Sequence, residues 1–330
     1  MTSPPADLRG ALALICGLDH AAIAEETAVF GVAGLPFRRV LARTEEDYLR
    51  ACGEADAVLV QYGAFSRRVF EGLPRLRVLV RYGVGVDGID LGAATDHGVP
   101  VVNVPDYGTD EVATQAVALL LALVRKITRL DRQTRAGRWD VFQVGGISRL
   151  AGRTVGIIGC GRIGGSVARK LSGFDVRLLG CDPYITVFPP GVLPVPLHRL
   201  LAESDYVTVH CPLTAETRHL LDAGTLALMR PTAILVNTAR GGIVDEAALH
   251  SALTQGVIRG AGLDVFDREP TAPDNPLLTL DSVITAPHMA GVTKESFDRM
   301  AIAVANNLLS VLDGKPNVDN VVNKEVLGHR

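Results

Sequence analysis

Ten short apolar runs, separated by stretches of helical character, constrain the fold of this chain more than any other feature. The runs are rich in Val, Ile and Leu without polar alternation, which is typical of parallel strands covered on both faces. They occupy residues 12–16, 57–60, 77–82, 99–104, 154–159, 176–181, 206–211, 233–238, 260–266 and 282–287. Alternation of such strands with helices predicts a doubly wound α/β architecture with parallel sheets.

The length of 330 residues is sufficient for two such domains. An apolar helix is predicted over Asp110–Arg132, buried between layers, and an amphipathic helix over Lys294–Asp313. We expect a nucleotide-binding domain over residues 106–290. The two ends of the chain, 1–105 and 291–330, would fold together as a substrate-binding domain.

Charge and cysteine content exclude several classes of protein. Lys and Arg total 33 against 36 Asp and Glu, so no basic surface for nucleic acid or anionic lipid is expected. The apolar stretch 112–124 is too short to cross a bilayer, and Met1–Gly10 lacks the pattern of a signal peptide. The five cysteines show no metal-ligand spacing and indicate buried thiols in a reducing compartment. We expect a soluble cytoplasmic protein without metal, membrane or nucleic-acid partners.

A glycine motif, G-x-G-x-x-G, lies in "GRTVGIIGCGRIGGSVARKL" at Gly159, Gly161 and Gly164. It follows a predicted strand and opens a predicted helix. Gly159 would allow the tight turn, Gly161 would let the backbone approach a pyrophosphate, and Gly164 would permit close packing of helix on strand. Because amides at a helix N-terminus bind phosphate, the context favours a dinucleotide site over a plain tight turn.

Asp182, eighteen residues after Gly164, ends the next predicted strand. Its carboxylate could accept hydrogen bonds from the ribose hydroxyls of a dinucleotide. It would repel a 2′-phosphate by about 4 kcal/mol at about 4 Å. The residues that follow are Pro183 and Tyr184 rather than arginine. The sequence therefore favours NAD over NADP.

Four ionisable residues follow later strands of the same domain: Arg240, Asp264, Glu269 and His288. Ligands of open α/β sheets bind outside the carboxyl ends of the strands, so these side chains could converge there. Each also has a structural alternative. Arg240 could form a surface ion pair, Glu269 could begin a turn, and His288 could be a polar residue at a strand end. For Asp264 we expect the role of bracing a loop.

Together the residues suit hydride chemistry on a 2-oxo acid. His288 could give a proton to the carbonyl oxygen and remove it in reverse. Glu269, hydrogen-bonded to the imidazole, would orient it and favour its charged form. Arg240 offers a planar fork to an α-carboxylate and a positive field to a developing alkoxide.

At this point the chain resembles a known family, the D-isomer-specific 2-hydroxyacid dehydrogenases, and most closely their phosphoglycerate dehydrogenase-like branch. The motifs are "RYGVGVDGIDLGAATDHGVPVVNVP", "GRTVGIIGCGRIGGSVA", "HCPLTAETRHLL", "LVNTARGGIVDEAAL", "GAGLDVFDREP" and "APHMAGVTKES". The resemblance implies a Rossmann NAD-binding domain inserted into a flavodoxin-like substrate domain. It also implies a homodimer packed through the cofactor domains.

The resemblance also assigns individual residues, and it makes Arg240, Glu269 and His288 catalytic. The residues assigned to the cofactor are Gly159, Gly161, Arg162, Ile163, Gly164, Asp182, Thr238 and Asp264, the last near the nicotinamide carboxamide. The amides of Val84 and Gly85 would hold the substrate carboxylate. Arg81 would meet a substrate phosphate or remain a surface charge.

Departures from the family pattern limit the prediction of substrate. Thr114 stands where an acidic residue is usual, and Gly108 replaces a frequent Asn. Phosphoglycerate is therefore not assured, and a phosphonate or sulfonate stays open. Formate dehydrogenases of this superfamily lack a glutamate like Glu269, so the sequence does not favour that activity. The rival interpretation is an NAD-sensing binding protein like the C-terminal-binding corepressors, which "EVATQAVALLLAL" partly resembles.

Overall fold

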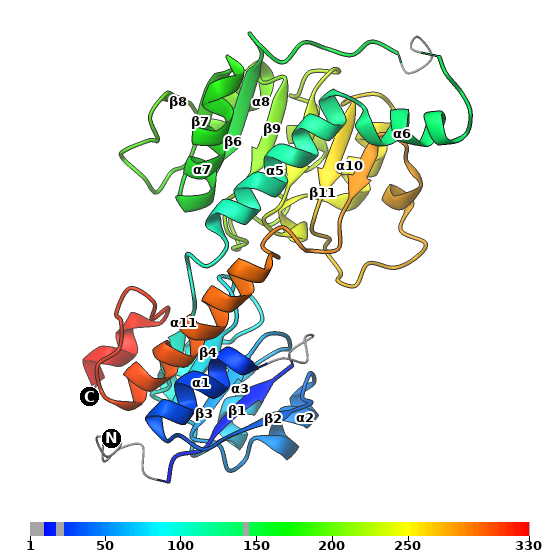
Figure 1. Cartoon of the computed structure of the whole chain (residues 1–330). Helices are drawn as coiled ribbons and strands as arrows, with labels where there is room; N and C mark the ends of the chain where they lie inside the picture. The colour runs from blue at the N-terminus through cyan, green and yellow to red at the C-terminus, as the bar shows by residue number, and fades with distance from the viewer. Residues whose placement is uncertain (1–9, 18–22, 141–144, 330) are drawn as a thin grey trace. The chain divides into compact units, whose positions relative to one another are not determined.

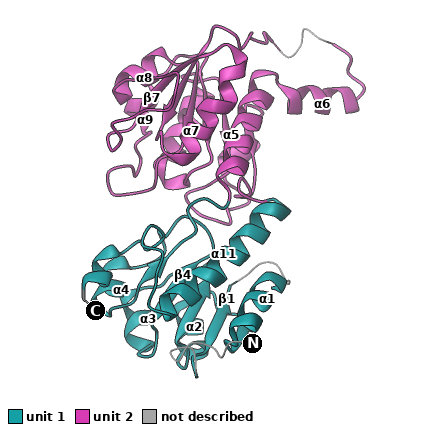
Figure 2. Ribbon diagram, turned by 60° about the vertical axis from the view of Figure 1, so that its left-hand side comes forward, with its two compact units in different colours: residues 1–107, 293–330 teal, residues 108–292 magenta. Residues whose placement is uncertain are grey.

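The computed structural model describes residues 10–17, 23–140 and 145–329. Residues 1–9, where the sequence showed no signal-peptide pattern, lie outside the described residues. The chain divides into unit 1, residues 1–107 with 293–330, and unit 2, residues 108–292 (Figure 2). Each unit contains one parallel sheet, so the predicted α/β class with two parallel-sheet domains is confirmed. In the described part of the chain, no helix is long and apolar enough to cross a membrane.

Unit 1 is built on a five-stranded parallel sheet in the order β2-β1-β3-β4-β5 (Figure 1). Its elements are β1 (Ala13–Cys16), α1 (Ala24–Ala33), β2 (Phe37–Val40), α2 (Glu45–Ala51), β3 (Ala57–Val60), α3 (Arg67–Gly72), β4 (Val78–Arg81), α4 (Leu91–Asp96), β5 (Val101–Val102), α11 (Lys294–Leu312) and the 3₁₀ helix η5 (Lys324–His329). Alternate residues of a strand enter opposite cores. Ala13 and Ile15 pack with α11 residues such as Val304, whereas Leu14 packs on the other face.

Unit 2 is built on a seven-stranded parallel sheet in the order β12-β11-β10-β9-β6-β7-β8. Its helices and strands are α5 (Thr109–Val124), α6 (Ile127–Arg135), β6 (Thr154–Ile158), α7 (Arg162–Leu171), β7 (Arg177–Cys181), β8 (Val192–Pro194), α8 (Leu197–Glu203), β9 (Tyr206–Val209), α9 (Ala223–Leu226), β10 (Ile234–Asn237), α10 (Glu246–Thr254), β11 (Gly260–Leu263) and β12 (Val283–Thr285). Its described residues also include the 3₁₀ helices η2 (Ser172–Phe174), η3 (Gly241–Ile243) and η4 (Pro276–Thr279).

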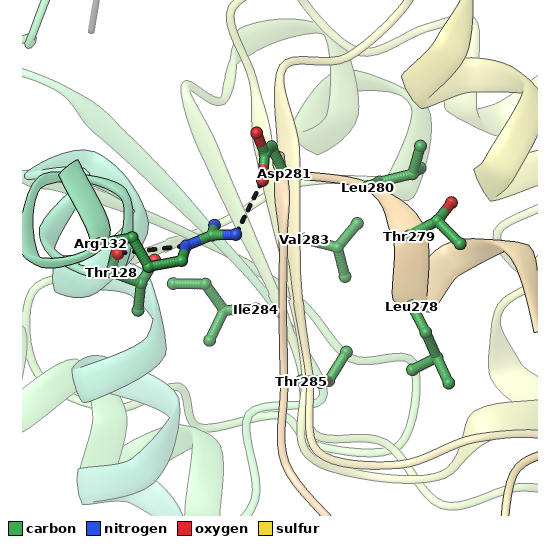
Figure 3. Close-up of a pocket in the computed structure, with 9 residues that line it drawn as sticks. All are labelled: Thr128, Arg132, Leu278, Thr279, Leu280, Asp281, Val283, Ile284 and Thr285. Atoms are coloured by element: carbon green, nitrogen blue, oxygen red, sulfur yellow. Dashed lines mark hydrogen bonds and ion pairs between the residues drawn. The ribbon is translucent and has the colours of Figure 1, made fainter. Parts of the chain in front are cut away.

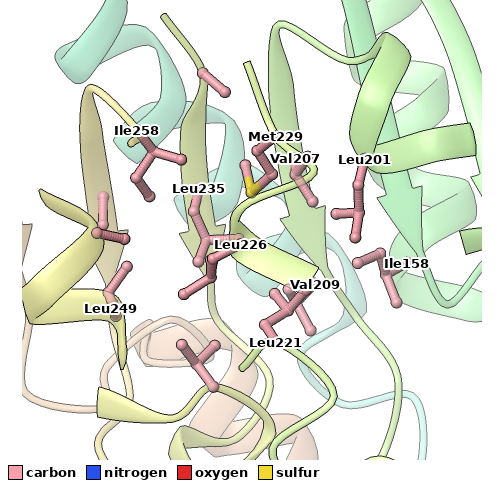
Figure 4. Packing of buried hydrophobic residues seen from close by; sticks show 14 of the residues in the cluster. Ile158, Leu201, Val207, Val209, Leu221, Leu226, Met229, Leu235, Leu249 and Ile258 are labelled. Atoms are coloured by element: carbon pink, nitrogen blue, oxygen red, sulfur yellow. The ribbon is translucent and has the colours of Figure 1, made fainter. Parts of the chain in front are cut away.

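The sheet of unit 2 is covered on both faces, which explains why its strands are apolar without alternation. Figure 4 shows one core, in which Val207 and Leu235 pack with α9 and α10 side chains such as Leu226 and Leu249. On the other face lies α5. A Cβ at Gly262 would lie 3.1 Å from the Leu119 Cβ, so the glycines of β11 allow α5 to pack closely.

Every one of the ten predicted runs contains a strand, but within the described residues two further strands were missed. β2 carries Arg38 and Arg39, and β8 ends at Pro194. Both strands lie at sheet edges, where burial on two faces is not required and polar residues and proline are tolerated. A search for continuous apolar runs therefore overlooks them.

The single helix predicted over residues 110–132 is wrong, because two helices occupy this region. α5 ends at Val124, Lys126 adopts a left-handed conformation with φ of 55°, and α6 begins at Ile127. α5 buries an apolar face, as expected, whereas α6 has no buried residue. The polar pair Arg125–Lys126 at the end of the apolar stretch marks the break.

We expect Gly164→Ala to destabilise unit 2. The added Cβ would lie 2.1 Å from the carbonyl oxygen of Gly159, and backbone cannot move aside cheaply. The cost should be about 3 kcal/mol, the upper end for overpacking, measured by urea unfolding followed by far-UV circular dichroism. Gly161→Ala is the matched control, because its Cβ would meet no atom within 4 Å. Equal stability of the two variants would contradict this packing.

Candidate active site

The carboxyl ends of three neighbouring strands carry the residues predicted to be catalytic. β10, β11 and β12 are adjacent and parallel. Arg240 follows β10, Asp264 directly follows β11, and His288 lies three residues beyond β12. Glu269 lies in the loop after β11. The structure therefore brings all four residues to the carboxyl ends of the strands of one sheet.

His288 and Glu269 are in direct contact. The imidazole Nδ1 lies 2.5 Å from Glu269 Oε2, and the backbone N–H of Phe266 donates to Glu269 Oε1 over 3.0 Å. The side chains are 47% and 36% exposed, so the pair can reach a ligand from solution. Burial acts to raise the pKa of Glu269. The hydrogen bond and charge of His288, the Phe266 amide and Arg240 outweigh burial, and the pKa is lowered. Glu269 is therefore a carboxylate at neutral pH.

Asp264 braces the segment that carries His288. Its fully buried carboxylate accepts the N–H groups of Met289 (3.0 Å) and Ala290 (2.9 Å), and its carbonyl accepts that of His288 (2.7 Å). His288 adopts φ of 52°, a conformation that costs a non-glycine residue energy and needs such support. Burial raises the pKa of Asp264, and the two amides oppose that shift. The geometry fits the bracing role expected for Asp264, and a contact with cofactor stays a prediction.

The loop that carries Arg240 is held by a residue that we did not predict. Asn237 is 1% exposed, and its side-chain Nδ2 donates to the Arg240 carbonyl over 2.8 Å while its Oδ1 accepts the Ala239 N–H over 3.0 Å. A Cβ at Gly241 would lie 1.9 Å from the Phe266 carbonyl carbon, so this loop packs directly on the loop leading to Glu269. A buried amide at the end of an apolar strand was the available signal for Asn237.

The glycine loop has the form that a dinucleotide site requires. Gly159 adopts φ of 85°, and a Cβ there would lie 2.5 Å from the Cys211 nitrogen. Gly161 instead faces open space, so backbone could approach a ligand. Among the described residues, the N–H groups of Arg162 and Ile163 at the start of α7 have no acceptor. Such groups attract an anion.

Asp182 directly follows β7 and Thr238 directly follows β10, so both lie at the carboxyl ends of strands in the same sheet. The carboxylate of Asp182 accepts the N–H groups of Cys160 (2.9 Å) and Tyr184 (3.0 Å), which joins it to the glycine loop. Thr238 is 7% exposed, and within the described ranges its hydroxyl has no hydrogen-bond partner. Buried hydroxyls are rarely left in that state, so Thr238 fits a residue that meets a bound group.

Of the residues predicted to bind substrate, Arg240 lies in unit 2, whereas Arg81, Val84 and Gly85 lie in unit 1. Arg81 ends β4, and its guanidinium folds beside Gly83, with Nη1 3.3 Å from where a Cβ of Gly83 would lie. The Val84 carbonyl accepts Asn103 Nδ2 over 2.7 Å. Among the residues that the structure describes, the N–H groups of Val84 and Gly85 have no acceptor. Amides in that state suit an anionic ligand.

A hollow of about 250 Å³ in unit 2 contains none of the predicted site residues (Figure 3). It lies between α6 and the edge strand β12, where Arg132 donates to Asp281 over 2.9 Å beside Ile284. The hollow is therefore separate from the chemistry proposed for the strand ends.

An α/β unit with a glycine turn and these strand-end residues defines a dinucleotide-binding protein, and comparisons with known proteins agree. The sequence model of the D-isomer specific 2-hydroxyacid dehydrogenase, NAD binding domain, matches residues 117–290. A glyoxylate reductase of Korarchaeum cryptofilum is 46% identical over 78% of this chain and 80% of its own. A D-3-phosphoglycerate dehydrogenase of Archaeoglobus fulgidus is 40% identical over 85% of this chain but only 54% of its own.

Solved structures give the same result. The NAD-dependent formate dehydrogenase of Staphylococcus aureus in complex with NAD shares 31% identity and superposes with a TM-score of 0.86 over 94% of this chain and 98% of its own. An acyclic imino acid reductase in complex with NADPH and D-Arg shares 29% identity and the same TM-score, over 94% of this chain and 99% of its own. The chain belongs to the D-isomer-specific 2-hydroxyacid dehydrogenases, with their NAD-binding domain, as its motifs predicted.

Glu269→Gln should remove a pH-dependent part of the stability. Because the pKa of Glu269 is lowered from 4.5 on folding, its stabilising contribution is present above about pH 4.5 and is lost as pH falls through the lower folded value. Calorimetric melting temperatures of wild type and variant should differ at pH 6 and converge as the pH is lowered progressively below 4.5. A difference that stays constant over this range would contradict the assignment.

Proposed function

We propose that this protein interconverts a D-2-hydroxy acid and its 2-oxo acid with NAD, and that His288 is the acid and base. The observation that carries the proposal is the His288–Glu269 contact, 2.5 Å long, beside Arg240 on the edge that holds the glycine loop. Unit 2 would bind NAD, and unit 1 would supply substrate contacts.

In this proposal His288 donates a proton from its ring to the substrate carbonyl oxygen during reduction and accepts it during oxidation. Nδ1 is engaged by Glu269, so the proton is exchanged at Nε2. The ionised Glu269 contacts Nδ1 and so keeps the ring in one orientation. The brace from Asp264 keeps the ring at the strand end.

Arg240 binds the α-carboxylate of the substrate and places a positive charge beside the carbonyl oxygen. Its loop is held by Asn237 and by packing of Gly241 against Phe266, and the guanidinium Nη1 donates to the Ala239 carbonyl over 2.7 Å. An arginine fork selects a carboxylate next to the reacting carbon, and this selects 2-oxo acids over simple ketones.

The cofactor residues of this proposal are the glycine turn with Arg162 and Ile163, together with Asp182 and Thr238. The amides at the start of α7 would receive the pyrophosphate, Asp182 the ribose hydroxyls, and the unpartnered Thr238 hydroxyl the nicotinamide end. NAD bound there supplies or accepts the hydride. The negative charge of Asp182 supports NAD rather than NADP.

In unit 1 the amides of Val84 and Gly85 would contact the substrate carboxylate. Arg81, near Gly83, would favour substrates with a second anionic group, a phosphate among them. The long relatives named for phosphoglycerate and the shorter ones named for glyoxylate are both similar to this chain. The substrate class that we propose is therefore a small 2-oxo acid, with or without an added anion.

We also propose a homodimer in the cytoplasm. What supports the dimer is exposed apolar surface at and after α6, where Ile127 is 54% and Trp139 89% exposed, since such side chains suit packing on a second copy. All five cysteines are free thiols, which suits a reducing compartment. Analytical ultracentrifugation that gives twice the 35.0 kDa chain mass would support the dimer, and a monomer would exclude it.

A screen of 2-oxo acids, followed by NADH absorbance, should find turnover that His288→Ala lowers by about 10²–10⁴-fold. His250→Ala, a histidine on α10 outside the site, is the control and should keep wild-type rates. Undiminished activity in His288→Ala would remove His288 from the mechanism. Negligible turnover with every acid, together with tight NADH binding, would favour the corepressor-like alternative.

Asp182→Ala should reduce the preference for NAD over NADP. Loss of the carboxylate removes repulsion of the 2′-phosphate and also the hydrogen bonds to ribose, so the ratio of kcat/KM values should fall on the order of tenfold or more. The NADH KM should also rise because Asp182 holds the Cys160 amide of the glycine loop. An unchanged ratio would refute the role given to Asp182.

A further inference from the structure

Tyr184 and Glu216 connect the two loops that flank the glycine loop. In the sheet order, β6 lies between β9 and β7. Tyr184 lies in the loop after β7 and Glu216 in the loop after β9, and the phenol donates a hydrogen bond to the Glu216 carboxylate. The bond therefore lies over the point where the strand order reverses, because β7 and β8 lie on one side of β6 and β9 on the other. Ligands of such sheets bind at this point.

Both ends of this bond are fixed by neighbouring contacts. The Tyr184 N–H donates to Asp182 over 3.0 Å, and Asp182 in turn accepts the Cys160 N–H of the glycine loop. On the other side, the Glu216 N–H donates to Thr214 over 3.2 Å, and the Thr217 hydroxyl donates to Pro212 over 2.7 Å. These contacts hold in place the two loops that carry the Tyr184 phenol and the carboxylates of Asp182 and Glu216.

Tyr184, Glu216 and Asp182 together offer a ligand an aromatic ring and two negative charges. Tyr184 is 75% exposed, so much of its side chain is available to a ligand. The hydrogen bond to Glu216 and the charge of Glu216 raise the pKa of Tyr184, with smaller effects of burial and of Asp182. The phenol is therefore neutral and lies in the field of both carboxylates.

We propose that Tyr184 and Glu216 form the adenosine side of the NAD site, and that Glu216 is a second determinant, besides Asp182, of the choice of NAD over NADP. This inference rests on the proposed cofactor site. The Tyr184 ring stacks on the adenine base, an interaction that NAD and NADP share. Glu216 acts on the 2′-phosphate alone, because only that group adds negative charge at this end of the molecule.

The two residues therefore have separable effects on equilibrium binding, which needs no turnover. Dissociation constants of NADH and NADPH would be measured by ligand fluorescence for wild type, Glu216→Gln, Tyr184→Phe and Tyr184→Ala. Glu216→Gln should leave NADH within about twofold and tighten NADPH about fivefold at low salt, an effect that shrinks as salt is added. Tyr184→Ala should weaken both cofactors about tenfold, and Tyr184→Phe should keep NADH affinity.

Glu203→Gln is the matched control for charge. Glu203 ends α8 just before β9 begins, so it lies near the amino ends of the strands, away from the glycine loop. Loss of its charge should leave the ratio of the NADPH and NADH dissociation constants unchanged. A wild-type ratio in Glu216→Gln, with NADH still bound tightly by wild type, would overturn this inference alone. Failure of the wild type to bind either cofactor would overturn the proposed function together with it.

Discussion

The buried carboxylate of Asp264 is the interaction on which the proposed chemistry depends. It accepts two backbone N–H groups from residues 289 and 290 and so turns the chain at the end of β12. Without that turn His288 would not hold its left-handed conformation or meet Glu269. A carboxylate with no exposed surface is costly unless hydrogen-bonded, and these amides meet that need.

The parallel sheet explains why residues far apart in sequence lie together at the carboxyl ends of the strands. Because all strands of unit 2 run the same way, the chain leaves every one of them at the same side. The glycine turn, Asp182, Arg240 and His288 each come directly or almost directly after a strand. At Gly159 and Gly241 the neighbouring backbone leaves no room for a Cβ, so glycine at these positions allows the loops to touch.

Much of this arrangement could be predicted from sequence because its causes are local. Two-sided burial requires apolar strands, and a tight turn at Gly159 requires glycine, so both leave a pattern in the residues. The edge strands β2 and β8 leave no such pattern because burial there is partial. The pair Arg125–Lys126 marks where the apolar stretch ends, but its charges do not specify the left-handed conformation of Lys126 that separates α5 from α6.

Tertiary contacts within the site were harder to predict. The spacing of Glu269 and His288 does not reveal a 2.5 Å contact, which depends on the packing of three loops. Their family motifs gave the roles, whereas the chemistry of each residue alone left a structural alternative open. Asn237 was missed because its bonds go to backbone of its own loop. Substrate identity depends on loops of unit 1, where one residue type suits many ligands.

The most direct measurement is a crystal structure of the protein with NADH and oxamate, an unreactive mimic of a 2-oxo acid. We expect the oxamate carboxylate on the Arg240 guanidinium and its carbonyl oxygen within about 3 Å of His288 Nε2, the distance of a hydrogen bond. Oxamate bound away from these two side chains, or a cofactor that leaves the glycine turn untouched, would contradict the account.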